Sequence, residues 1–285
     1  MDLALVETIV ELRTRVARRR SAGPVGLVPT MGALHDGHLS LITRARRDCA
    51  TIVVSIFVNP IQFDQPEDLE RYPRSLDADV ALCRGLGVDV VFAPPVPVMY
   101  PAPLECTVEV GRLADHLCGR HRPGHFSGVA AVVLKLLQIV QPHTAYFGEK
   151  DAQQLAVIRR LVADFNVPVR IVGVPTVREA DGLALSSRNQ RLDPAERGLA
   201  PALYRALLQV KDGIAAGVTD AAELKRRGVE QIGGDERLRL EYLEIVDPDD
   251  FQPVERVTGP VVAAGALWVG ATRLIDNVRC TPGES

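Results

Sequence analysis

The sequence predicts an α/β fold, with a Rossmann-like parallel sheet that carries helices on both faces and a smaller C-terminal α+β domain. Apolar runs alternate with amphipathic helical patterns over the first 175 residues. Several of these runs are apolar at every position, which is typical of strands covered on both sides. After residue 194 the pattern changes to helices followed by strands, as in α+β domains.

In the first part, strands are expected at residues 25–28, 51–58, 88–92, 145–147 and 169–174. Helical patterns at residues 3–19, 39–49, 76–86, 129–140 and 152–165 separate them. This alternation predicts a parallel sheet, whose ligands bind outside the carboxyl ends of the strands. The stretch 93–103 is rich in proline, so it can be neither a regular helix nor a central strand, and we expect a stiff surface connection there.

The second part is predicted to be a separate, smaller domain. Helices are expected at residues 195–211 and 221–232, and strands at 238–246, 261–264 and 266–269. Because the character of the sequence changes near residues 181–187, we place the domain boundary between residues 183 and 184. The expected domains are therefore residues 1–183 and residues 184–285.

The composition excludes several classes of protein. With 47% hydrophobic and 24% charged residues, the chain of 285 residues is an ordinary globular protein. Its net charge of −3 provides no basic field for nucleic acid or an anionic membrane. No apolar segment is long enough to span a bilayer, and no signal-peptide pattern opens the chain. Five scattered cysteines without a C-x-x-C pair indicate reduced thiols, so we expect a cytoplasmic protein.

Two histidines stand at the start of the helix that follows the first of these strands. The turn Met-Gly-Ala-Leu-His-Asp-Gly-His, residues 31–38, brings His35 and His38 there. A helix start offers unpaired N–H groups and a partial positive charge, which suit an anion. Two imidazole donors beside it could hold a polyphosphate and stabilise its charge as a bond breaks. Nucleotide chemistry is the first interpretation, although no P-loop or G-x-G-x-x-G motif is present. A helix cap or a surface position is the alternative for each histidine.

Two amides follow the next strand. Asn59 and Gln62 flank the turn that Pro60 fixes, and amides suit hydroxyl and carboxylate groups because they both donate and accept hydrogen bonds. A simple Asx turn is the alternative. Tyr72, a little further on, is a candidate polar contact or a packing residue.

Three later segments carry charges or hydroxyl groups. Residues 120–128 are rich in cations, and a flexible loop that contacts a carboxylate or phosphate is favoured there, because the spacing matches no zinc pattern. In residues 148–151, Lys150 can contact a phosphate and Asp151 can cap a helix or contact a ribose. Two serines and an arginine in residues 185–188 can bind a triphosphate. Each segment taken alone could also be a surface loop.

Taken together in this order, the motifs closely resemble those of the pantoate–β-alanine ligase family, the pantothenate synthetases. The matching pieces are Pro-Thr-Met-Gly-Ala-Leu-His-Asp-Gly-His, Phe-Val-Asn-Pro-Ile-Gln-Phe, Tyr-Pro-Arg, Arg-Pro-Gly-His-Phe-Ser-Gly-Val, Phe-Gly-Glu-Lys-Asp and Ser-Ser-Arg-Asn. The family belongs to the nucleotidylyl-transferase superfamily, whose HIGH-type motif is here residues 35–38. Its second signature loop is here residues 185–188, with Leu185 where many members have methionine.

The resemblance implies a reaction in two steps. The carboxylate of (R)-pantoate attacks the α-phosphorus of Mg-ATP, which gives pantoyl adenylate and pyrophosphate. The amine of β-alanine then attacks the acyl carbon, which releases AMP and pantothenate, the precursor in the coenzyme A pathway. It also implies a homodimer, with Mg²⁺ brought by ATP and no metal ligand assigned to a protein side chain. The smaller domain would close over the ATP site.

The resemblance also implies roles for individual residues. His38, His35, Lys150 and Arg188 would be catalytic. Gln62 would bind both pantoate and β-alanine, Gln154 would bind pantoate, and Asn59 and Tyr72 would complete the substrate site. The residues implied to bind ATP are Met31, Gly32, Ala33, Leu34, His35, Asp36, Gly37, His38, Gly148, Glu149, Lys150, Asp151, Val177, Leu185, Ser186, Ser187 and Arg188.

Two other functions stay open. A nucleotidyltransferase of the same superfamily would adenylate a phosphorylated substrate, but it would need a second phosphate pocket where this sequence has amides. A non-catalytic ATP-binding regulator would be favoured by loss of His38 or Lys150, and both are present.

Overall fold

The computed structural model describes residues 3–283, and the chain divides into two compact units. The first unit comprises Met1–Val110, Pro123–Glu149 and Val157–Pro175, and the second comprises Gly111–Arg122, Lys150–Ala156 and Thr176–Ser285. The boundary expected between residues 183 and 184 falls inside the second unit. Two short segments that precede this boundary, Gly111–Arg122 and Lys150–Ala156, also belong to that unit.

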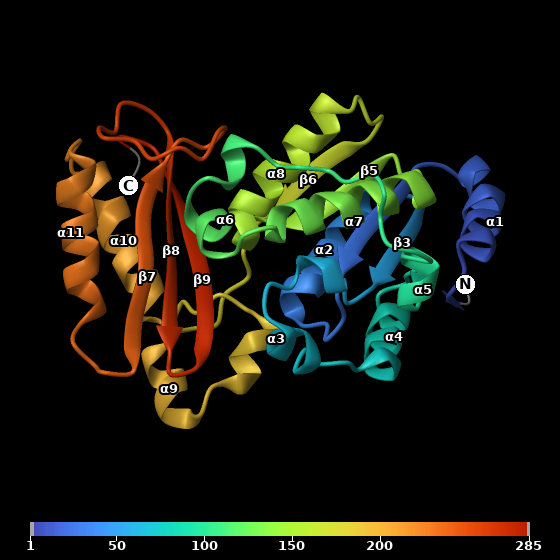
Figure 1. The fold of residues 1–285 in the computed structure, drawn as a ribbon, viewed down its shortest axis with the longest axis horizontal. Helices are drawn as coiled ribbons and strands as arrows, with labels where there is room; N and C mark the ends of the chain where they lie inside the picture. The colour runs from blue at the N-terminus through green and yellow to red at the C-terminus, as the bar shows by residue number, and fades with distance from the viewer. Residues whose placement is uncertain (1–2, 284–285) are drawn as a thin grey trace. The chain divides into compact units, whose positions relative to one another are not determined.

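A sheet of six parallel strands forms the centre of the first unit (Figure 1). Its order is β1-β4-β3-β2-β5-β6, and every neighbouring pair is parallel. The predicted parallel sheet is therefore confirmed. The strands are β1 (Ala4–Val6), β2 (Val25–Thr30), β3 (Thr51–Ile56), β4 (Val90–Phe92), β5 (Thr144–Gly148) and β6 (Arg170–Val174).

Helices cover both faces of this sheet, which explains why its strands are apolar throughout. Alternate strand residues such as Val28, Ile52 and Val54 pack against α2 and α4. Side chains in between point to the opposite face, where α1 and α7 contact each other and strands β4 and β2. The helices in this part of the chain are α1 (Ile9–Arg19), α2 (Asp36–Asp48), α3 (Pro66–Glu70), α4 (Leu76–Gly85), α5 (Val96–Met99), α7 (His125–Val140) and α8 (Ala152–Asp164), with short 3₁₀ turns η1 (Arg20–Ala22) and η2 (Pro60–Gln62). The first residues of α8, 152–156, belong to the second unit.

An antiparallel sheet with the order β7-β8-β9 forms the second unit (Figure 1). Val261, Ala263 and Leu267 of β8 pack with α10 and α11, and the alternate Val262 and Ala264 pack in another cluster with residues near α6. Both faces of β8 are covered, so the strand is apolar at every position. The elements are η3 (Arg112–Ala114), α6 (Leu117–His121), η4 (Glu149–Asp151), η5 (Ser187–Arg191), α9 (Pro194–Leu199), α10 (Ala202–Ala215), α11 (Ala221–Ile232), β7 (Leu238–Val246), β8 (Val261–Val269) and β9 (Thr272–Cys280).

Four expectations about elements were wrong. The expected helix at residues 3–19 begins only at Ile9, because Thr8 caps it and Ala4–Val6 pair with β4. The helix expected at 195–211 is two helices that separate at Pro201. The proline-rich stretch contains the short helix α5, and the two strands expected at residues 261–264 and 266–269 are the single strand β8. In addition, strand β9 was not predicted.

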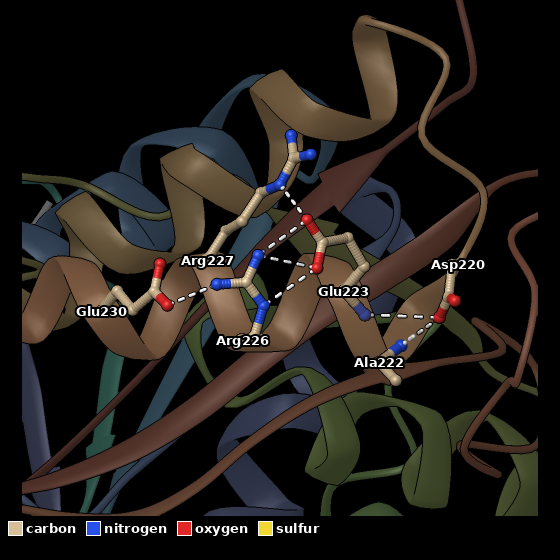
Figure 2. Close-up of polar contacts among 6 residues, drawn as sticks. All are labelled: Asp220, Ala222, Glu223, Arg226, Arg227 and Glu230. Carbon is tan, nitrogen blue, oxygen red and sulfur yellow. Dashed lines mark hydrogen bonds and ion pairs between the residues drawn. The ribbon is translucent and has the colours of Figure 1, made fainter.

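Charged side chains form a row of ion pairs, called here the ladder, along the exposed face of α11 (Figure 2). Asp220 caps the helix by accepting backbone N–H bonds of 2.9 and 3.3 Å. Glu223 pairs with Arg226 and Arg227, and Arg226 also pairs with Glu230. Exposed pairs of this kind add little stability, so the cap matters more than the ladder. Within residues 3–283, no helix has the length and apolar character needed to cross a bilayer.

A buried ion pair links the last strand of the second unit to the chain that precedes α9. The Arg178 guanidinium donates to both carboxylate oxygens of Asp276, at 2.6 and 2.9 Å, and lies 3.9 Å from the centre of the Tyr204 ring. Asp276 is only 6% exposed. Removal of the carboxylate would leave a largely buried cation without its counter-charge.

We expect Asp276→Ala to lower the free energy of unfolding by about 3–5 kcal/mol for this reason. Urea unfolding followed by tryptophan fluorescence tests this directly, because the one tryptophan of the chain, Trp268, lies in β8 of the same unit. Asp235→Ala, which removes an exposed pair with Arg237, is the matched control and should leave the midpoint unchanged. Equal midpoints for both variants would contradict the expectation.

Candidate active site

Polar residues follow the carboxyl ends of four neighbouring strands in the first unit. β2 leads into residues 31–38, β3 into Asn59 and Gln62, and β4 into the segment that holds Tyr100, while β5 ends at Gly148. The chain moves outward from β2 through β3 and β4, and later returns to β5 on the other side of β2. Open α/β sheets bind ligands at such a switch point. The candidate site is therefore built at this edge.

A buried carboxylate holds the turn between β2 and α2. Gly32 and Ala33 both have left-handed backbone conformations, with φ of 84° and 49°. Ala33 is strained there because it has a Cβ. The Asp79 carboxylate from α4 accepts hydrogen bonds from the backbone N–H groups of Ala33 (3.0 Å) and Leu34 (2.8 Å). Asp79 is 1% exposed, so the two N–H groups supply much of its solvation. Sequence reasoning missed this residue, whose only signal is an acid on the apolar face of a helix.

The two histidines cap α2 reciprocally. His35 is the N-cap residue, and its Nδ1 accepts from the Gly37 N–H at 3.2 Å. The Nδ1 of His38 accepts from the His35 N–H at 3.3 Å. This is the arrangement of a capping box, with imidazoles in place of the usual hydroxyl and carboxylate. The ring centroids lie 4.2 Å apart. The helix cap, which was the alternative for each histidine, is therefore present, and the role of the two rings as donors to a phosphate stays a prediction.

The capping bonds fix the tautomer of both rings. An Nδ1 atom that accepts a hydrogen bond carries no proton, so each neutral ring carries its proton on Nε2. Each histidine is therefore an Nε2–H donor at a helix N-terminus, where unpaired backbone N–H groups add partial positive charge. Both rings are partly exposed. An anion such as a phosphate group is the ligand this arrangement suits.

Asn59 and Gln62 form a buried amide pair at the end of β3. The Asn59 Nδ2 donates to the Gln62 Oε1 at 2.9 Å, and the Gln62 Nε2 donates to the Met31 Sδ at 3.4 Å. Asn59 is 1% exposed and Gln62 is 9% exposed. Met31 thus connects the amide pair to the turn that carries the histidines. An amide that donates towards this turn can bind a hydroxyl or carboxylate oxygen.

The start of α7 supports the backbone of the amide pair. The His125 Nδ1 lies 2.8 Å from the Gln62 carbonyl oxygen, to which it must donate. At Gly128 a Cβ would lie 2.4 Å from the Ile61 carbonyl oxygen, so only glycine allows this close approach. The flexible loop expected at residues 120–128 is mostly helical, since it contains the end of α6 and the start of α7.

Tyr72 lies in an aromatic contact. It is 6% exposed, and its ring meets the Phe63 ring edge-on with centroids 5.8 Å apart. This contact accounts for the ring, and the role of the hydroxyl in the substrate site stays a prediction.

In the second unit, a narrow hairpin precedes the serine-rich segment. Leu185 N–H donates to the Val177 carbonyl oxygen at 3.0 Å, and Arg178 bridges to Ala184. The Ser186 hydroxyl then accepts from the Arg188 N–H at 3.2 Å and caps η5. Residues 177 and 185–188 are thus held in one local structure.

The start of α8 contributes two neighbouring glutamines with different surroundings. Gln153 is buried, and its side chain bonds to the backbone of residues 113, 116 and 118. Gln154 is partly exposed on the next position of the helix. Of the two, Gln153 is occupied in holding α6, which leaves Gln154 as the candidate for a ligand.

The predicted site residues fall into two groups. In the first unit, the structure connects Met31 with Gln62 and Asn59, and joins His35 to His38. Among residues 3–283, no cluster of three or more His, Cys, Asp or Glu side chains could hold a metal ion. The first unit contains residues 31–38, Asn59, Gln62, Tyr72, Gly148 and Glu149, and the second contains Lys150, Asp151, Gln154, Val177 and residues 185–188.

Comparison with known proteins assigns the chain to a family. The sequence profile described as Pantoate-beta-alanine ligase matches residues 4–279. The chain belongs to the pantoate–β-alanine ligase family. The expectation drawn from the motifs is therefore confirmed at the level of the family.

Relatives in this family are of two lengths. A pantothenate synthetase of Moorella thermoacetica is 52% identical over 277 residues, which cover 97% of this chain and 98% of the relative. A bifunctional pantoate ligase/cytidylate kinase of Thermosynechococcus vestitus is 54% identical over 273 residues, 95% of this chain. The match spans only 53% of that relative, so the ligase chain is about half the length of such bifunctional members.

Solved structures of the family share this fold. A pantothenate synthetase of Thermus thermophilus matches with a TM-score of 0.92 and 49% identity, over 96% of this chain and 98% of its own. The pantoate–β-alanine ligase of Francisella tularensis, complexed with beta-gamma ATP and β-alanine, matches with a TM-score of 0.80 and 35% identity. That match covers 100% of this chain and 99% of the Francisella chain.

We expect Asp79→Asn to loosen the turn before α2. The asparagine side chain keeps one acceptor oxygen, so it can accept from only one of the two backbone N–H groups that the carboxylate holds. Hydrogen exchange of the Ala33 and Leu34 amides should become about tenfold faster or more. Asp89→Asn is the matched control, since Asp89 is as deeply buried but pairs with Arg19 and Arg46. It should lower stability without a local effect on residues 31–38. A turn that exchanges equally fast in both variants would contradict the role of Asp79.

Proposed function

We propose that the protein condenses (R)-pantoate with β-alanine to pantothenate, at the expense of ATP and through pantoyl adenylate. The observation that supports this best is the position of two Nε2–H imidazoles beside a buried amide pair. Met31 links the two groups. One group suits the phosphates of a nucleotide and the other suits a hydroxy acid. Membership of the ligase family supports the same reaction.

In the first step, a carboxylate oxygen of pantoate attacks the α-phosphorus, and the bond from that phosphorus to pyrophosphate breaks. Such a displacement needs positioning and charge neutralisation more than covalent help from the protein. We propose that His38 and His35 donate to the phosphate oxygens through their Nε2–H groups. Lys150, Arg188 and the Mg²⁺ that accompanies ATP would neutralise further charge.

In the second step, the amine of β-alanine attacks the acyl carbon. The bond between that carbon and the oxygen of AMP breaks, and the attacking nitrogen loses a proton. We propose that Gln62 contacts both pantoate and β-alanine, while Gln154 contacts pantoate. The ligands named for the Francisella structure, ATP and β-alanine, support two of the three substrates.

We propose further contacts to ATP from four segments of the chain. Backbone and side-chain groups of residues 31–38, residues 148–151, Val177 and residues 185–188 would bind the nucleotide. Closure of residues 184–285 over ATP would keep water from the mixed anhydride. We also propose a homodimer in the cytoplasm.

A substrate that carries a phosphate group fits the amide pair less well. Asn59 and Gln62 are neutral, and both Asn59 donors already bond to protein acceptors. A phosphate group would need cationic partners at that position. The arrangement therefore favours a hydroxy acid over the substrate of a phosphate-adenylating relative.

Exchange of labelled pyrophosphate into ATP isolates the first step. We expect exchange only when pantoate is present, without any need for β-alanine, and formation of AMP and pantothenate when β-alanine is added. Pantoate should be compared with a phosphorylated acid of similar size. Exchange that is indifferent to pantoate, or that depends on the phosphorylated acid, would refute the proposed function.

We expect His38→Ala to slow the exchange reaction at least ~100-fold, because a donor to the developing charge is lost. Since alanine also removes the helix cap, His38→Asn is the informative partner variant. Its side-chain oxygen can accept the His35 N–H bond, but it has no Nε2–H group. His38→Asn should therefore be nearly as slow as His38→Ala and as stable as the wild type.

The control is His143→Ala, a substitution of an exposed histidine that precedes β5 and accepts from the Val25 N–H at 2.9 Å, which should keep normal exchange. If His38→Asn restored the wild-type rate, His38 would be a capping residue alone. The catalytic role given to its imidazole would then be withdrawn.

A further inference from the structure

A chain of side-chain hydrogen bonds crosses the carboxyl ends of three neighbouring strands. The Tyr100 hydroxyl, which follows β4, donates to the Asn59 Oδ1 at 2.8 Å. The Asn59 Nδ2, which follows β3, donates to the Gln62 Oε1 at 2.9 Å. The Gln62 Nε2 donates to the sulfur of Met31, which follows β2, at 3.4 Å. We call these four residues the relay.

Every bond of the relay has a fixed direction. Asn59 uses both amide hydrogens, one on the Gln62 Oε1 and one on the Gly128 carbonyl oxygen at 3.2 Å. Its Oδ1 is left to accept from Tyr100. A reversed Asn59 amide would bring its oxygen against two acceptors, the Gln62 Oε1 and the Gly128 carbonyl oxygen. Because Asn59 is 1% exposed, water could not compensate.

The orientation of Asn59 sets the orientation of Gln62. The Gln62 Oε1 must face the Asn59 donor, so its Nε2 faces Met31 and the histidine turn. A thioether sulfur is a weak acceptor. A carboxylate or hydroxyl oxygen of a ligand would therefore replace it readily, and the bond to a carboxylate would be much stronger.

We infer that Tyr100 is a positioning residue that makes Gln62 a hydrogen-bond donor to the acid substrate. The inference rests on the proposed function, in which Gln62 binds pantoate. It assigns a role to the end of the proline-rich stretch, which otherwise serves only as a connection. Tyr100 does not touch the substrate itself; it acts through Asn59.

The surroundings of Tyr100 suit this role. Burial raises the pKa of its phenol to about 12, so the hydroxyl keeps its proton and remains a donor at neutral pH. The centroid of its ring lies 6.0 Å from the centroid of the Phe57 ring and 5.6 Å from the Lys135 Nζ. These contacts restrict the Tyr100 ring to one position. A residue that supports a ligand-binding group must itself be held in this way.

Tyr100→Phe tests the inference, because it removes the hydroxyl and keeps the ring. The buried Asn59 Oδ1 would lose its donor, and the orientation of the amide pair would then depend on the bond from Asn59 to the Gly128 carbonyl oxygen. In pyrophosphate exchange at saturating ATP, we expect the KM for pantoate to rise about tenfold. The KM for ATP and the rate at saturating pantoate should stay within about twofold of the wild type, as when a ground-state contact weakens.

Tyr146→Phe is the matched control. Tyr146 is also buried in the first unit, and its hydroxyl bonds to Asp48 and Cys49 instead of the amide pair. It should leave the KM for pantoate unchanged. An unchanged KM in Tyr100→Phe, or an equal rise in both variants, would overturn the inference.

A second measurement does not depend on the proposed function. Solvent exchange of the side-chain amide protons of Asn59 and Gln62 in ¹⁵N-labelled protein should be slow in the wild type and in Tyr146→Phe, and faster in Tyr100→Phe. If the wild type showed no pantoate-dependent exchange of pyrophosphate, the proposed function would fail while this measurement still decided the relay. Equal amide exchange in all three proteins would reject the relay.

Discussion

The parallel pairing of β2 with β3 on one side and β5 on the other is the constraint on which the first unit depends. Parallel strands all end at the same edge, so residues far apart in the sequence meet there. The turn after β2 brings the imidazoles, the turn after β3 brings the amides, and the segment after β4 brings Tyr100. In an antiparallel arrangement of the same strands, neighbouring carboxyl ends would lie at opposite edges and these groups would be separated.

Position alone does not give these polar groups their chemistry; hydrogen-bond direction does. The capping bonds of α2 take the Nδ1 atoms of both histidines, which leaves the proton on the Nε2 atoms. The bonds of Asn59 take the Gln62 oxygen, which leaves the nitrogen as the donor. In both cases a backbone or side-chain partner inside the protein decides what a ligand would meet. The site is therefore specified one layer behind the groups that would touch a substrate.

Buried acids serve two different purposes in the chain. Asp89 and Asp276 face arginines, and their main role is to compensate buried charge. Asp79 faces two backbone N–H groups, and it holds a turn in a conformation that Ala33 would otherwise avoid. The first kind stabilises a unit as a whole. The second kind shapes one loop, and that loop carries the histidines.

The sequence by itself determined the parallel sheet, the histidine turn, the amide pair and the family, because local periodicity and motif order carry that information. It could not reveal that Ala4–Val6 is an edge strand, since only pairing with β4 makes it one. It also missed β9, because a charged residue such as Asp276 argues against a buried strand position. Only the ion pair with Arg178 allows Asp276 to be buried there. The roles of Asp79 and Tyr100 were decided only by the tertiary structure. Each acts through a contact more than 40 residues away, and local sequence patterns carry no record of such contacts.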